Sequence, residues 1–178
     1  MEIGDYWEAI NNWHEKAKEE DDFFIKFILE YISFIAFLEN IKPSINDRKL
    51  IQRLKRNSTL KKIYLDKVDK TIVKNLMEEL EQRPIENVGM SNDRWWDCDA
   101  DTYLDFVSEN NGKLRSINDY VNIIEFIYRA RNNLFHGRKS LNYERDLTIV
   151  RYSFELLKPL MDIILNNEEF KTRLFYEN

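Results

Sequence analysis

The chain has 178 residues, of which 43% are apolar and 33% are charged, and its formal net charge is −5. A single Cys excludes a disulfide framework, and two His leave little room for a multi-His metal centre. Only four Gly and three Pro argue against a β fold with many tight turns. The length and composition predict one mostly helical domain over residues 1–178.

The segment at the start of the chain carries no targeting signal that we recognise. Residues 1–5 have neither the basic nor the apolar region of a signal peptide. The most apolar stretch, residues 23–38, is interrupted by Lys26 and Glu30 and is short for a membrane span, so it favours a buried helix. We therefore predict a cytoplasmic protein that does not bind a membrane.

Four helices are predicted in the first half of the chain from apolar residues at helical spacing: residues 5–19, 23–40, 45–56 and 66–82. The second is apolar on nearly all sides, which is typical of the central helix of a bundle. Asp21 or Asp22 can cap it, and Ser44 can cap the third. Pro84 ends the fourth helix.

The stretch 48–63 carries seven basic residues and no acidic one. Such a cluster can bind phosphates, although the chain as a whole is acidic. It can also be a solvated helix face that is balanced by the acidic residues at 15–22. Five of its cations are secondary candidates for RNA contacts: Arg53, Lys55, Arg56, Lys61 and Lys62.

The region 85–115 is predicted to be a long irregular insertion, of the kind that often carries function in compact domains. After it, Ser116 can cap a helix that runs to about Phe135, where Gly137 marks its end. A last helix is predicted over residues 142–166, followed by a short extra turn.

Polar residues gather at the end of the helix that leads to Gly137. Arg129, Asn132, Asn133 and His136 have the i, i+3, i+4, i+7 spacing of one helical face. Arg131 falls within the apolar arc, where it needs a carboxylate, carbonyl or phosphate partner. These residues are either an ordinary helix C-terminus, whose cations complement the helix dipole, or a phosphate-binding site.

The segment from Arg131 to His136 resembles the R-x4-6-H signature of the HEPN superfamily. It also has a polar residue, Asn132, directly after the arginine, as active members usually do. The resemblance implies an all-α, four- to five-helix up-and-down bundle. It also implies metal-independent endoribonuclease activity without a cofactor, as in toxins, anti-phage effectors and RNA-processing factors. Arg131, His136 and Asn132 would be catalytic, and Arg129 and Asn133 secondary RNA contacts.

The resemblance further implies a homodimer. Such nucleases build one site from two motifs, and no Arg precedes the only other histidine, His14. Two copies of the segment 129–137 would therefore meet across a twofold axis. Phe126 is either part of that interface or a core residue. An antitoxin or another defence-system protein is a possible further partner.

Two alternatives to a nuclease stay open. The chain could be a non-catalytic module of the same fold that binds a nucleotide, a nucleic acid or a protein partner. It could also be a purely structural helical protein, in which replacing His136 changes stability alone.

Overall fold

The computed structural model describes residues 3–41, 47–85, 112–135 and 144–173. This part of the chain contains eight helices and no strand, so the prediction of an all-α bundle is confirmed, with more and shorter helices than the four to five expected. None of the described helices combines the length and the apolar character needed to cross a membrane.

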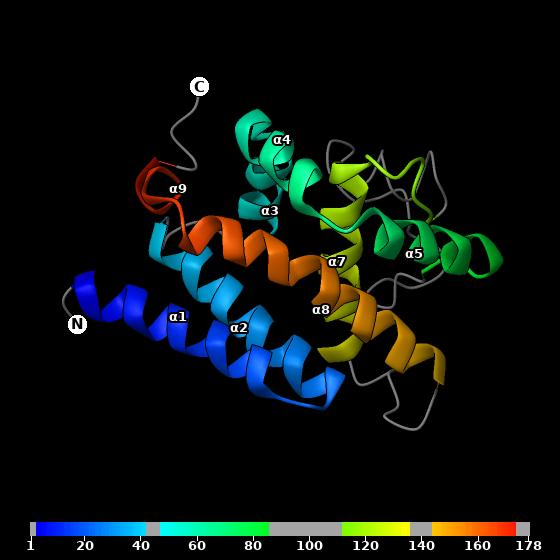
Figure 1. Ribbon diagram of the computed structural model, residues 1–178, viewed down its shortest axis with the longest axis horizontal. Coiled ribbons are helices and arrows are strands. Elements are labelled where there is room, and N and C mark those ends of the chain that lie inside the picture. Colours follow the sequence, from blue (N-terminus) through cyan, green and yellow to red (C-terminus); the bar gives the residue numbers. More distant parts are fainter. Residues whose placement is uncertain (1–2, 42–46, 86–111, 136–143, 174–178) are drawn as a thin grey trace.

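Helix α2 (Phe23–Ile41) lies at the centre of the N-terminal half, packed against α1 (Ile3–Glu19) and α8 (Glu144–Leu165). Figure 1 shows α1 and α2 side by side as a hairpin, with α8 running alongside α2. Asp22 caps α2, because its Oδ1 accepts the backbone N–H groups of Phe24 and Ile25 at 2.8 and 3.1 Å. Of the two predicted caps, Asp22 is the one used.

Three short helices follow: α3 (Asp47–Arg56), α4 (Ser58–Lys67) and α5 (Lys70–Gln82). The prediction missed α4 and began α5 four residues early. Asn57 caps α4 by accepting the N–H of Leu60 at 2.7 Å, and Asp69 caps α5 by accepting that of Thr71 at 2.8 Å. These two polar residues are the local signals that divide the segment into separate helices.

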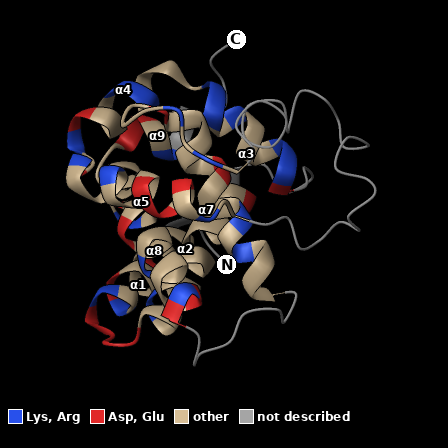
Figure 2. Cartoon of the chain, turned by 90° about the vertical axis from the view of Figure 1, so that its right-hand side faces the viewer, with Lys and Arg blue, Asp and Glu red and all other residues tan. Residues whose placement is uncertain are grey.

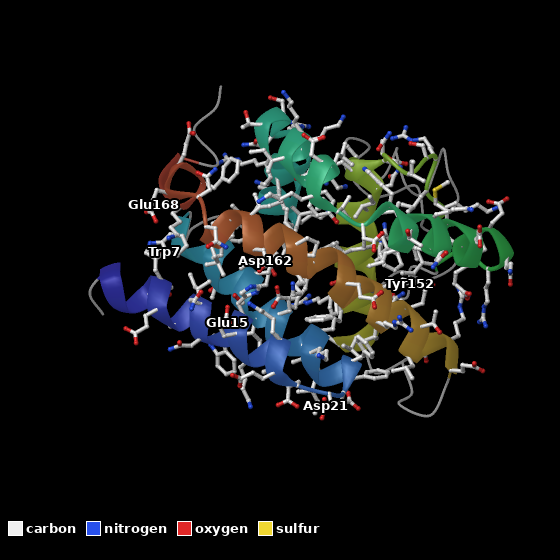
Figure 3. The ribbon with its side chains drawn as sticks, in the orientation of Figure 1. Trp7, Glu15, Asp21, Tyr152, Asp162 and Glu168 are labelled. Atoms are coloured by element: carbon white, nitrogen blue, oxygen red, sulfur yellow. The ribbon has the colours of Figure 1, made fainter. Side chains whose placement is uncertain are left out.

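Helix α7 (Tyr120–Phe135) packs against α3 and α8 and is buried along most of its length. It begins at Tyr120 rather than beside Ser116, whose Oγ instead accepts the N–H of Asn118 in the preceding turn. The short α9 (Glu168–Arg173) is the predicted extra turn, and it returns to α1. There, the ammonium of Lys171 lies 5.8 Å from the centre of the Trp7 ring (Figure 3).

The segment 86–111 lies outside the described residues, but the residues that flank it are neighbours. Ile85 donates its N–H to the carbonyl of Gly112 at 3.3 Å. Gly112 has a φ of +78°, and a Cβ atom at this position would lie 2.7 Å from the Ile85 carbonyl oxygen. Both the backbone conformation and the close approach therefore require glycine.

Candidate functional site

The predicted catalytic motif lies at the C-terminal end of α7. Arg131 and Asn132 occupy the last helical turns, and α7 ends at Phe135. His136 and Gly137 follow immediately in sequence but lie outside the described residues. The geometry of the site is therefore built from the arginine, its neighbours on α7, and the helices that pack beside them.

Arg131 is half-buried and is held mainly by aromatic rings. Its guanidinium carbon lies 5.4 Å from the centre of the Tyr31 ring on α2 and 5.0 Å from that of Phe135. Its Nη1 donates to Oδ1 of Asn132 at 2.9 Å. Its Nε is buried and has no hydrogen-bond partner within the described part of the chain. The rings and Asn132 thus fix a cation whose donors are only partly used.

Tyr31 is a site residue that the sequence analysis missed. It is 3% exposed, and its hydroxyl has no hydrogen-bond partner among the residues that the structure describes. Burial raises the pKa of this phenol, and the positive charge of Arg131 opposes that rise only in part. Tyr31 is therefore a neutral ring beside Arg131. One aromatic residue in a helix rich in Phe gives no sequence signal for such a role.

A second polar cluster surrounds Glu125, one and a half turns before Arg131. Its carboxylate is fully buried and accepts hydrogen bonds from Arg48 at 2.9 Å to both oxygens, from Lys55 at 2.5 Å and from Arg129 at 3.0 Å. Burial alone would raise the pKa of Glu125, but the charges of Lys55, Arg48 and Arg129 hold it below its usual range. This cluster joins α3 to α7.

The cluster corrects two predicted RNA contacts. Lys55 is 7% exposed and Arg129 is 2% exposed, and both bind Glu125 instead of facing solvent. Asn133, at 1% exposure, is also buried. Two members of the predicted polar face, Arg129 and Asn133, are thus buried in the fold. Phe126 is fully buried, so it is a core residue and not a surface for dimerisation.

The other predicted RNA contacts lie on the surface. Arg53 and Arg56 are exposed near the end of α3, and Lys61 and Lys62 are exposed on α4. None of these four side chains forms an ion pair with a described acidic residue. The predicted basic cluster is thus divided between buried cations that hold the fold and exposed cations that face solvent.

His14 has a structural environment of its own. It is 2% exposed, and its Nδ1 lies 2.8 and 3.0 Å from the carboxylate oxygens of Glu30, while its Nε2 lies 2.9 Å from Asp162. Because both ring nitrogens lie within hydrogen-bond distance of carboxylate oxygens, this geometry favours the imidazolium form, which carries a proton on each nitrogen. Burial lowers the pKa of His14, but the hydrogen bonds and charges of Asp162 and Glu30 outweigh it and raise the pKa to about 9. This cationic clamp joins α1, α2 and α8, and its member on α8, Asp162, is labelled in Figure 3.

Within the described ranges, His, Cys, Asp and Glu side chains form no group of three or more that could hold a metal ion. No protein family, curated protein or solved structure matches the chain.

Proposed function

We propose that the chain is a metal-independent endoribonuclease of the HEPN type, acting in toxin, anti-phage or RNA-processing biology. The observation that carries the proposal is the state of Arg131. Its guanidinium is fixed by Tyr31, Phe135 and Asn132, keeps its buried Nε without a described partner, and stands five residues before His136. A fixed, planar, incompletely used cation, with a histidine five residues later in the sequence, suits a phosphate that gains charge during reaction.

In the proposed reaction, His136 accepts the proton of a ribose 2′-OH, a task for which imidazole has a suitable pKa. The 2′-oxygen attacks the adjacent phosphorus, and the bond from phosphorus to the 5′-oxygen breaks. Arg131 stabilises the charge on the pentacovalent phosphorus centre. Asn132 acts by orienting that guanidinium, since its Oδ1 accepts from Nη1. The products are a 2′,3′-cyclic phosphate and a 5′-OH.

The leaving 5′-oxygen needs a proton, and we propose that a second copy of the chain supplies it. His14 is committed to Glu30 and Asp162 inside the fold and is 2% exposed, so it does not serve as the second histidine. A homodimer would bring two His136 residues to one composite site. A cytoplasmic location and an antitoxin or defence-system partner belong to the same proposal.

The test is cleavage of single-stranded RNA by the purified chain in EDTA. We expect His136→Ala and Arg131→Ala each to lower the rate by about 100-fold or more, the usual contribution of such groups. Arg131→Lys should also fail, because an ammonium lacks the planar donor fork. Arg151→Ala, which removes an exposed arginine from α8, is the matched control and should cleave normally.

Two outcomes would contradict the proposal. Cleavage that persists in His136→Ala would remove the assigned base. If the wild-type chain binds RNA but does not cleave it anywhere between about pH 6 and pH 8, the non-catalytic module is favoured instead. A substrate with a 2′-deoxyribose at the cleaved position should resist cleavage, which separates attack by the 2′-OH from hydrolysis by water.

A further inference from the structure

The basic residues of α3 lie on two different faces of that helix. Arg48 and Lys55 are seven residues apart and therefore share a face, and both donate to the buried carboxylate of Glu125. The next face carries exposed or half-exposed cations at i, i+4 and i+7 spacing: Lys49, Arg53 and Arg56. The first set joins α3 to α7 through Glu125.

The exposed face continues onto α4. Helix α3 ends at Arg56, Asn57 caps α4 directly after it, and Lys61 and Lys62 are exposed one turn later. We call the four exposed residues Arg53, Arg56, Lys61 and Lys62 the basic elbow. Figure 2 shows basic segments on both helices.

Among the residues that the structure describes, no acidic side chain forms an ion pair with the basic elbow. No acidic residue occurs in the sequence between Asp47 and Asp66, and Glu125 is already shared by three cations. Two exposed lysines elsewhere in the described chain do form ion pairs, Lys16 with Glu20 and Lys74 with Glu78. An uncompensated cationic surface on a chain of net charge −5 attracts polyanions locally.

We infer that the basic elbow binds the sugar-phosphate backbone of a single-stranded nucleic acid and guides it toward the end of α7. Helix α3 provides the connection, because Arg48 at its start lies 5.0 Å from the Tyr128 ring, one turn from Arg131. The choice of RNA rests on the proposed function. A single strand fits that reaction because its backbone can bring the 2′-oxygen in line with the departing 5′-oxygen.

The same residues fit a lipid surface less well. Helices that lie on membranes insert apolar side chains between lipids. The apolar residues of α3 are buried in the core, and none of the large exposed hydrophobic residues in the described chain lies on α3 or α4. The surface is therefore suited to a flexible chain of phosphates.

The experiment measures binding separately from cleavage. The probe is a fluorescein-labelled single-stranded oligodeoxynucleotide of about 16 residues, which lacks the 2′-OH and cannot be cleaved by the proposed reaction. Anisotropy titrations run from about 50 to 200 mM salt. Four phosphate contacts predict a slope of log K against log salt of about −2.8, so a fourfold rise in salt weakens binding about 50-fold.

Three double variants carry the same change in net charge. Arg53→Gln with Arg56→Gln, and Lys61→Gln with Lys62→Gln, should each reduce the slope by about 1.4. The control, Lys16→Gln with Lys74→Gln, should bind like the wild type. Because all of these side chains are exposed, circular dichroism should show an unchanged helical fold.

The inference is overturned if the elbow variants bind like the wild type, if the control loses as much affinity as they do, or if anionic phosphatidylserine vesicles bind through the elbow more tightly than the oligonucleotide. Elbow-dependent binding by a chain that never cleaves RNA would support this inference while contradicting the proposed function. RNA cleavage that the elbow variants leave unchanged at low salt would support the proposed function while contradicting this inference.

Discussion

The clamp formed by His14 makes the stability of the fold depend on pH in a defined direction. The pKa of His14 is raised from 6.5 to about 9, so the folded state binds the proton more tightly than the unfolded chain does. The resulting stability is fully present below pH 6.5 and is lost as pH rises toward 9. That difference in pKa corresponds to about 3 kcal/mol of unfolding free energy.

The perturbation is His14→Gln, which keeps a hydrogen-bond donor but removes the positive charge. Urea unfolding, followed by circular dichroism, should show the variant about 3 kcal/mol less stable than the wild type at pH 6, because Glu30 is left fully buried without a cation. The difference should shrink toward zero above pH 9, where the wild-type imidazole is neutral as well.

Asp162→Asn provides a second check on the same reasoning. It removes one of the two carboxylates that hold the imidazolium, so the pH window over which stability is lost should move to lower pH. If the unfolding free energies of the wild type and His14→Gln differ by the same amount from pH 6 to pH 9.5, the claim that His14 is positively charged in the clamp is refuted. A histidine proton NMR signal that titrates near neutral pH and disappears in His14→Gln would refute it independently.

Three further predictions follow from other contacts. Glu125→Gln leaves Arg48, Lys55 and Arg129 around a neutral amide and should cost about 3–5 kcal/mol in urea unfolding; a loss below about 1 kcal/mol would contradict the network. Tyr31→Leu should slow RNA cleavage far more than Tyr31→Phe, which retains the ring beside Arg131; equal rates would exclude a positioning role for the ring. Gly112→Ala should lower stability by about 1–3 kcal/mol, whereas an unchanged melting temperature would show that the turn relaxes freely.

Much of the architecture could be predicted from local patterns. The apolar spacing predicted α1, α2, α3 and α8 to within about three residues, and the polar residue Asp22 caps α2 as an N-cap preference suggests. Helix α4 was not predicted, because its apolar residues form only a weak stripe. The signals that mark its two ends are polar residues: Asn57 caps α4, and Asp69 caps the next helix, α5. Local signals of this kind identify helices without showing which faces meet.

The candidate site shows where local patterns stop being sufficient. The helical wheel placed Arg129 on a polar face, but a polar face is exposed only if no other helix brings compensating charges to it. Arg48 and Lys55 come from a distant part of the sequence, and together with Glu125 they make that face a buried interface. The ring of Tyr31 beside Arg131 is likewise a contact between α2 and α7 that no spacing within either helix encodes.

The hydrogen bond between Ile85 and Gly112 has a consequence for how the chain tolerates change. Since the two residues already touch, the fold needs only a short turn between them, and the free-energy cost of closing a longer connection grows slowly with its length. We therefore expect a change in the length of the connection between these two residues to alter the free-energy cost of closing it only slightly. The backbone contact between Ile85 and Gly112 thus sets the spacing of α5 and α7 whatever the number of residues that joins them.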